Sequence, residues 1–175
     1  AFGLKALAEA AGADVRLLPI ARDTRESLAA AFAMLDGVDL LLTVGGASVG
    51  DYDLVGDAAA GHGIERAFYK VAMRPGKPLM AGRAGEMAMI GLPGNPVSAL
   101  VCGVIFVMPA IRAMLGLGAA PAPREVARLA ADLPANGPRE HYMRARIGAD
   151  GVAAGGLFQL ADKRDDSVGA FEPFE

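Results

Sequence analysis

Three short stretches of this sequence carry residues suited to binding an anion. The first, "GGASVGDYD" (45–53), combines a serine hydroxyl with glycines, whose backbone N–H groups can approach an anion closely. Its two aspartates, Asp51 and Asp53, offer the oxygen ligands that Mg²⁺ prefers. The stretch therefore predicts a metal-assisted phosphate site, and the alternative is a glycine-rich turn followed by a solvated helix start.

The second stretch, "KVAMRPGKPLMAGR" (70–83), lies where the local charge changes sign. Residues 36–57 contain five Asp and no Lys or Arg, whereas five basic residues follow against a single acid: Arg66, Lys70, Arg74, Lys77 and Arg83. Arg74 and Lys77 flank a Pro-Gly pair that predicts a rigid corner, and strand alternation places Lys70 on the same face as Arg74. The stretch predicts a basic anion site, and a solvated strand face is the alternative.

The third stretch, "LPGNPVSA" (92–99), takes the chain from an apolar strand directly into a helix. Asn95 occupies the N-cap position, and Pro96 already has the φ angle that the first helical residue needs. The free backbone N–H groups of such a helix start carry partial positive charge and accept oxyanions. The stretch predicts a third anion-binding element.

Alternating helices and strands are expected to position the three stretches. Helical periodicity and caps predict helices at 1–11, 24–37 and 54–60, and apolar runs predict strands at 14–20, 38–44, 65–74, 78–82 and 86–92. The unbroken apolar run 38–44 predicts burial on both faces. We therefore predict an α/β fold with a three-layer, mainly parallel sheet and ligands at the carboxyl ends of its strands.

Composition limits the classes of function. The 175 residues are 53% hydrophobic with a net charge of −3, and no basic face or tail is visible, which argues against nucleic acid and membranes as partners. The single cysteine, Cys102, cannot form an internal disulfide and favours a reducing, cytoplasmic location. The apolar run 97–117 is predicted to be a buried helix kinked near Pro109.

A change of composition near residue 118 predicts a second domain. The segment "GAAPAPR" (118–124) suits a linker, and the later segments alternate around a "DG" turn typical of a β-hairpin. We expect one α/β domain at 1–118 and a partial β domain at 119–175. The sequence has no initiator Met and is expected to begin inside a domain.

The motifs "TVGGASVGDYDLV", "MRPGKPLMAG" and "GLPGNPVSA", in this order, resemble the molybdopterin molybdenumtransferase (MoeA) family, which includes a domain of gephyrin. The resemblance covers about residues 1–145. It implies a molybdopterin-binding, MogA-like α/β domain followed by a small, incomplete β-barrel-like domain, in a protein that is a homodimer at full length. The implied activity is insertion of molybdate into adenylylated molybdopterin, with Mg²⁺ and release of AMP.

The resemblance also implies roles for individual residues. Asp53 and Lys77 are expected to be catalytic, and Asp53 is expected to hold Mg²⁺. The residues expected to bind the substrate phosphate groups and molybdate are Gly45, Gly46, Ser48, Gly50, Lys70, Arg74, Lys77, Pro93, Gly94, Asn95, Pro96 and Ser98.

Two departures from the family pattern bear on activity. The T-G-D-E-L motif is absent, and "DKRDDSVGAF" matches the Q-x-S-S stretch of the family only loosely, so the resemblance does not include these two parts of the family pattern. The alternatives are a molybdopterin adenylyltransferase on the same scaffold, against which the P-G-N-P-V-S motif argues, and a non-catalytic scaffold or interaction module.

Overall fold

The structure is a computed structural model of the chain, and it describes residues 1–46, 54–120, 125–133, 135, 137–149, 151–157 and 169–171. The chain divides into two compact units. Ala1–Val71 and Gly76–Ala119 form the first unit, whereas Ala72–Pro75 and Ala120–Glu175 form the second. The expected domains, 1–118 and 119–175, stay a prediction.

The first unit contains a four-stranded sheet in the order β1-β5-β4-β2. Its strands are β1 (Leu40–Val44), β5 (Met87–Leu92), β4 (Met80–Ala84) and β2 (Glu65–Tyr69). Only β1 and β5 are parallel, and β4 is antiparallel to both of its neighbours. The prediction of a mainly parallel sheet is therefore wrong: the short turn between β4 and β5 is long enough only for a hairpin, so the sheet is mixed.

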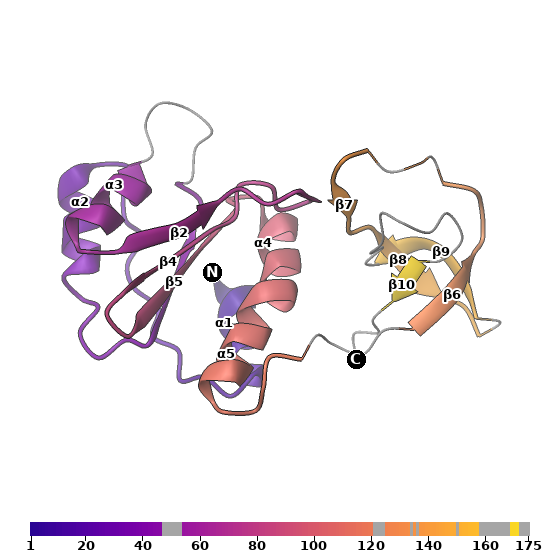
Figure 1. The fold of residues 1–175 in the computed structure, drawn as a ribbon, viewed down its shortest axis with the longest axis horizontal. Coiled ribbons are helices and arrows are strands. Elements are labelled where there is room, and N and C mark those ends of the chain that lie inside the picture. The colour runs from indigo at the N-terminus through magenta and orange to yellow at the C-terminus, as the bar shows by residue number, and fades with distance from the viewer. Residues whose placement is uncertain are drawn as a thin grey trace. The chain divides into compact units, whose positions relative to one another are not determined.

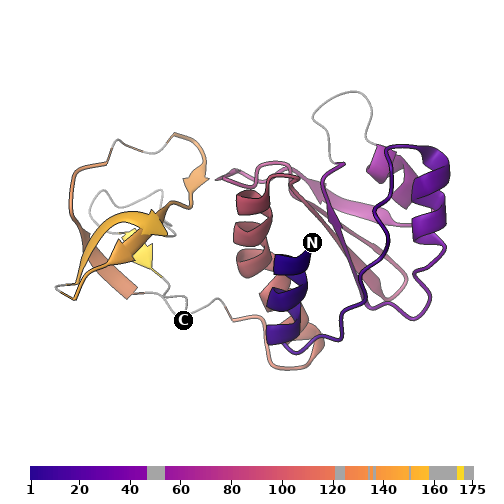
Figure 2. The ribbon, with the colours of Figure 1, turned by 180° about the vertical axis from the view of Figure 1, so that it is seen from behind.

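Helices cover both faces of this sheet (Figures 1 and 2). On one side lie α2 (Arg25–Phe32) and α3 (Leu54–Gly61), and on the other lie α1 (Phe2–Ala10) and the helical run that begins with α4 (Pro96–Cys102). The core between the sheet and α2 and α3 contains Leu28, Phe32, Leu41, Val55, Ala59, Ile64, Met80 and Met89. The predicted α/β class is confirmed.

Two helix starts follow the capping signals of the sequence. The Thr24 side chain accepts a hydrogen bond from the Ser27 N–H at 3.2 Å, and α2 begins at the next residue, Arg25. Asn95 does the same for the N–H of Ser98 at the start of α4. Both caps satisfy backbone donors that the helix itself leaves without partners.

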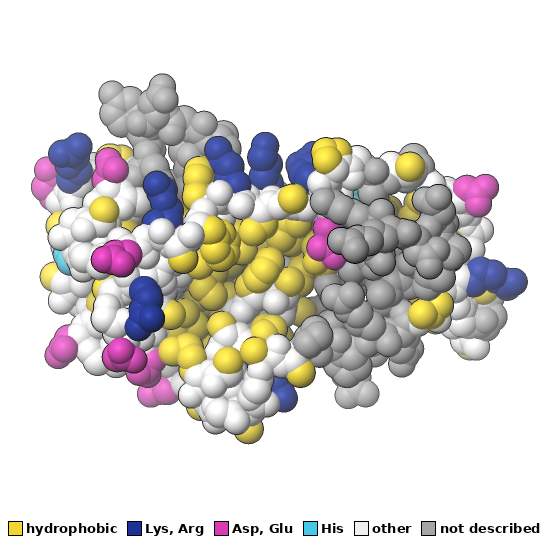
Figure 3. All heavy atoms as spheres, in the orientation of Figure 1, with side chains coloured by type: hydrophobic (Ala, Val, Ile, Leu, Met, Phe, Trp, Pro, Cys, Tyr) yellow, Lys and Arg dark blue, Asp and Glu magenta, His cyan; other side chains and the backbone are white. Residues whose placement is uncertain are grey.

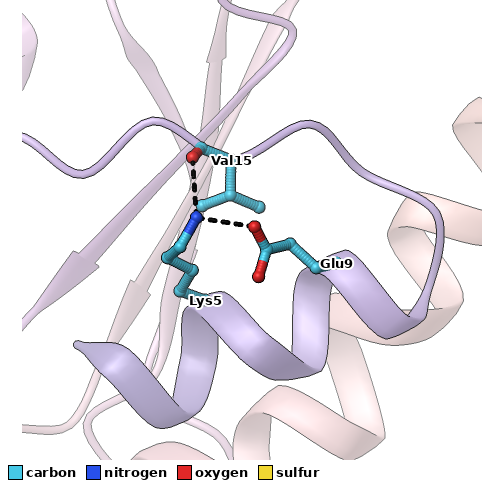
Figure 4. Close-up of polar contacts among 3 residues, drawn as sticks. All are labelled: Lys5, Glu9 and Val15. Atoms are coloured by element: carbon cyan, nitrogen blue, oxygen red, sulfur yellow. Dashed lines mark hydrogen bonds and ion pairs between the residues drawn. The ribbon is translucent and has the colours of Figure 1, made fainter.

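Residues 14–20, which we expected to form a strand, form none. No described strand pairs with them, so their backbone lacks the ladder partner that a strand requires. A side chain of α1 bonds to this segment instead: Lys5 Nζ donates to the Val15 carbonyl oxygen at 3.4 Å (Figure 4). The same Nζ also pairs with Glu9 of α1 at 2.6 Å. In the described sheet β1 is consequently an edge strand, and Val44 is 44% exposed, so the prediction that β1 is buried on both faces is also wrong.

The apolar helical run Pro96–Met114 consists of α4, the π-helical turn η1 (Gly103–Val107) and α5 (Met108–Met114). The predicted interruption near Pro109 takes the form of this π turn, where the Met108 N–H bonds to the Gly103 carbonyl. Proline has no N–H for the regular ladder, and a wider turn next to it accommodates the loss.

By length and composition alone this run is able to cross a membrane, with a mean hydropathy of 2.0. A core helix of a soluble protein passes the same test, so the observation is weak evidence for a membrane. Only 28% of the residues in the apolar window are buried. The helix is therefore less buried than we predicted.

The second unit is built from short strands. Its larger sheet has the order β10-β6-β9-β8, with β6 (Glu125–Leu129), β8 (Arg144–Ile147), β9 (Val152–Leu157) and β10 (Gly169–Phe171). A hairpin joins β8 to β9, as the "DG" turn predicted. A separate pair joins β3 (Met73–Arg74) to β7 (Glu140–His141) in parallel. Closure into a barrel-like domain stays a prediction.

Candidate functional site

The topology of the first unit brings the expected site segments to one edge of its sheet. β1 and β5 are parallel, and β2 runs in the same direction because β4 is antiparallel to both β5 and β2. The carboxyl ends of β1, β5 and β2 therefore share an edge, uppermost in Figure 1. Gly45, Pro93 and Lys70 are the first residues after these three strands. Figure 3 shows Lys and Arg side chains gathered along this upper edge.

The loops after β1 and β5 touch through their glycines. The Gly45 N–H donates to the Leu92 carbonyl at 3.0 Å, and Gly45 and Gly46 have φ angles of 79° and 74°. A Cβ atom placed on Gly94 would lie 3.3 Å from the Gly45 Cα. The two backbones approach this closely because neither residue has a side chain.

Asn95 makes the helix start after β5 a complete N-terminal cap. Its Oδ1 accepts the Ser98 N–H at 3.1 Å and the Ser98 hydroxyl at 3.3 Å, and Pro96 is the first helical residue. Pro93 is buried, whereas Gly94 and Asn95 are exposed. The predicted cap is confirmed, and anion binding at this helix start stays a prediction.

Lys70 ends β2 by turning the chain. Its φ angle is 73°, a left-handed conformation that non-glycine residues rarely adopt. Its N–H donates to the Leu79 carbonyl at 2.8 Å, and the Val71 N–H donates to the Lys77 carbonyl at 3.0 Å. The predicted continuous strand 65–74 is therefore wrong, and so is its placement of Lys70 and Arg74 on one strand face.

Arg74 lies in the second unit, in β3, whereas Lys77 lies in the first. Arg74 is opposite His141 in the β3–β7 pair, and its carbonyl accepts the Tyr142 N–H at 2.7 Å. Burial, and then the positive charges of Arg74 and Arg139, lower the pKa of His141. The sequence showed no link between Arg74 and these two residues, since only the pairing of β3 with β7 joins them.

We expect the lowered pKa of His141 to make stability depend on pH. Between this lowered value and the ordinary 6.5, the unfolded chain binds more protons than the folded one, so the free energy of unfolding rises with pH across that range. Denaturant unfolding at a series of pH values should show a loss of stability as the pH falls below about 6.5. The loss should shrink in His141→Gln, and an identical pH profile for both proteins would contradict the assignment.

The remaining expected residues of the glycine loop, Ser48, Gly50 and Asp53, lie outside the described residues. Within the described ranges, no group of three or more His, Cys, Asp or Glu side chains is arranged to hold a metal ion. Coordination of Mg²⁺ by Asp53 stays a prediction. Burial raises the pKa of Cys102 to about 11, so its thiol stays protonated and belongs to the core.

Thr43 is a polar residue at this edge that sequence patterns did not mark. It lies in β1 opposite Gly91 of β5, and its buried hydroxyl oxygen has no hydrogen-bond partner among the residues that the structure describes. A Cβ atom on Gly91 would lie 3.3 Å from this oxygen, so the glycine leaves room for the side chain. An apolar strand with one threonine carries no signal that would single it out.

An α/β unit whose glycine loops, capped helix start and lysine meet at the carboxyl edge of its sheet is typical of domains that bind a small molecule at that edge. Residues 1–113 match the family described as "Probable molybdopterin binding domain", and the chain belongs to this family.

Curated relatives carry the name molybdopterin molybdenumtransferase. The Mycobacterium tuberculosis protein named molybdopterin molybdenumtransferase 2 is 40% identical over 114 residues, which are 61% of this chain and 28% of the relative. The Nostoc relative is 35% identical over 147 residues (81% and 34%), and the Bacillus subtilis relative is 34% identical over 139 residues (79% and 32%). The chain thus spans about a third of the length of these relatives.

Solved structures show the same fold. A molybdopterin biosynthesis MoeA protein from Pyrococcus horikoshii matches with a TM-score of 0.70 and 22% identity, over 97% of this chain and 44% of that one. A molybdenum cofactor biosynthesis protein from Pyrococcus furiosus matches with a TM-score of 0.65 and 21% identity, over 87% of this chain and 49% of that one.

Proposed function

We propose that the protein to which this chain belongs is a molybdopterin molybdenumtransferase of molybdenum cofactor biosynthesis. It inserts molybdate into adenylylated molybdopterin and releases AMP. The observation that carries the proposal is the common edge at which β1, β5 and β2 end, because it gathers Gly45, Asn95 and Lys70 from three distant parts of the chain. The names of the relatives at 34% to 40% identity support it.

In this proposal backbone N–H groups, hydroxyl groups and basic side chains all bind the substrate. The glycine loop (Gly45, Gly46, Ser48, Gly50) and the capped helix start (Pro93, Gly94, Asn95, Pro96, Ser98) offer N–H and hydroxyl donors to phosphate oxygens. Lys70, Arg74 and Lys77 supply positive charge for the phosphate groups and molybdate. Asp53 would hold Mg²⁺, which supplies further charge neutralisation when bound.

The wider setting of the protein is part of the same proposal. Its partners are adenylylated molybdopterin and molybdate in the cytoplasm, the full-length protein is a homodimer, and neither nucleic acid nor a membrane is bound. The net charge of −3 supports the absence of nucleic acid, because any positive site on such a surface has to be local.

The test is release of AMP from adenylylated molybdopterin. The protein is incubated with this compound, Mg²⁺ and molybdate, and AMP is measured by chromatography, with molybdate omitted from a parallel sample. We expect molybdate-dependent AMP release. If no AMP is released and the fluorescence of the pterin shows no binding, the proposed function is wrong.

Lys77→Ala is expected to weaken binding of adenylylated molybdopterin by about 1.5 to 3 kcal/mol, because one charge-assisted contact is lost. Folding should be nearly unchanged, since the Lys77 side chain is exposed and lies outside the core cluster. Calorimetric titration together with a thermal melt separates the two quantities. Unchanged affinity would remove Lys77 from the site.

A further inference from the structure

A bulge in β2 places two residues that normal strand alternation would separate on one face. Arg66 pairs with Gly82, and Phe68 pairs with the preceding residue of β4, Ala81, so one extra residue lies between Arg66 and Phe68. Residues three apart in a regular strand point to opposite faces. The extra residue cancels that difference, and Arg66 and Tyr69 share the face that carries Met80 and the core.

Gly82 allows the bulge to form. A Cβ atom at Gly82 would lie 2.6 Å from the Glu65 carbonyl oxygen and 3.3 Å from the Arg66 Cα. No side chain fits between the two backbones at that distance, so the bulged strand can approach β4 only where β4 has a glycine. The bulge is therefore supported by the sequence of the neighbouring strand.

A second backbone irregularity brings Lys70 to the same aromatic ring. The left-handed turn at Lys70 places its Nζ 4.7 Å from the centre of the Tyr69 ring. The Arg66 Cζ lies 5.4 Å from the same centre. Both distances are within the range of cation–π attraction. One ring thus holds two cations, and the two charges are no farther apart than the sum of these distances.

The location of this group matches an anion site. Tyr69 is the last residue of β2, and Lys70 follows it at the edge where β1 and β5 also end. Arg66 and Lys70 are exposed, and the Tyr69 side chain packs partly against the core, which fixes the ring. Two positive charges that contact one ring both attract an approaching anion.

We propose that Arg66 and Lys70 form a binding site for a phosphoanhydride, in which Tyr69 is a positioning residue. Its two linked phosphoryl groups suit two cations held at one ring, each able to make charge-assisted hydrogen bonds. The left-handed backbone of Lys70 and the bulge before Phe68 are the local costs of this arrangement. The proposal rests on the proposed function only in treating Lys70 as a substrate contact.

The test uses inorganic pyrophosphate as the probe, titrated calorimetrically into the chain. Arg66→Gln removes one charge and should lower the affinity about tenfold. Tyr69→Leu keeps an apolar side chain but removes the ring, and it should lower the affinity for pyrophosphate severalfold. Tyr69→Phe keeps the ring face and should bind pyrophosphate as tightly as the parent does. Added salt should narrow these differences.

Arg112→Gln is the matched control. It makes the same change in charge in the last turn of α5, far along the helical run that starts at the site edge with Pro96. Circular dichroism and a thermal melt show whether each variant is folded. Parental pyrophosphate affinity in folded Arg66→Gln would overturn the proposal, and so would an equal loss in Tyr69→Phe and Tyr69→Leu, because packing or the hydroxyl would then explain the effect.

The outcomes also separate this site from the proposed function. If the variants lose pyrophosphate binding as expected but the parent releases no AMP from adenylylated molybdopterin, the phosphoanhydride site stands and the proposed function fails. If the parent releases AMP and Arg66→Gln binds pyrophosphate as well as the parent does, the proposed function stands and this site fails.

Discussion

Gly46→Ala is expected to destabilise the first unit by about 2 to 4 kcal/mol, from backbone strain together with overpacking. Gly46 has a φ angle of 74°, and a Cβ atom there would lie 2.3 Å from Val55 Cγ2 of α3. Val55 is 6% exposed and part of the core, so it cannot move aside freely. Substrate affinity should fall as well, because the loop after β1 would have to move away from α3.

Two further variants separate the backbone strain at Gly46 from the steric clash with Val55. Gly63 has a φ angle of 77° with nothing within 4 Å of its Cβ position, so Gly63→Ala reports the strain alone, about 1 kcal/mol or slightly more. In Gly46→Ala/Val55→Ala the collision is removed, and the double variant should be less destabilised than the sum of the single changes. Urea unfolding measures the parent, the double variant and the single variants Gly46→Ala, Val55→Ala and Gly63→Ala. Equal costs for Gly46→Ala and Gly63→Ala would show that the contact with Val55 has no effect.

Local signals in the sequence were sufficient where a structure depends on neighbouring residues. Thr24 and Asn95 cap the helices that their positions predicted, because an N-cap needs only a side-chain oxygen and an N–H three residues later. The strands β4 and β5 likewise lie where two short apolar runs predicted them, but their antiparallel pairing was not predicted. The order of glycine loop, basic stretch and capped helix start was enough to recognise the family.

Long-range pairing explains the features that the sequence did not predict. Residues 14–20 have the composition of a strand but no described strand beside them, so they form none. Lys70 leaves the strand conformation although no Gly or Pro marks a turn there, and β3 pairs with β7 across a wide separation in sequence. Such features depend on which backbones meet, and a periodic pattern within one segment holds no information about that.

Asn95→Asp is expected to melt at or slightly above the parental temperature while binding adenylylated molybdopterin much more weakly. Asp is as good an N-cap as Asn, since it keeps the oxygen that accepts the Ser98 N–H at 3.1 Å. A negative charge at a helix start adds about 0.3 to 1 kcal/mol of stability. The same charge would face the substrate phosphate, so affinity should fall about tenfold or more.

Asn95→Ser and Asn95→Ala are measured beside Asn95→Asp. The Pro93–Pro96 turn either only starts a helix or also binds the substrate phosphate, and these two explanations predict different affinities for the three variants. If the turn only starts a helix, affinity follows stability: Asn95→Ala loses about 0.5 to 2 kcal/mol of stability, and both capped variants bind like the parent. If the helix start holds the substrate phosphate, neutral, capped Asn95→Ser binds well and Asn95→Asp binds poorly although both are fully folded. Asn95 is exposed, so added salt should restore much of the affinity lost in Asn95→Asp. Parental affinity in Asn95→Asp would leave the turn with a structural role alone, and the glycine loop and the basic residues would be the remaining anion-binding groups of the proposed site.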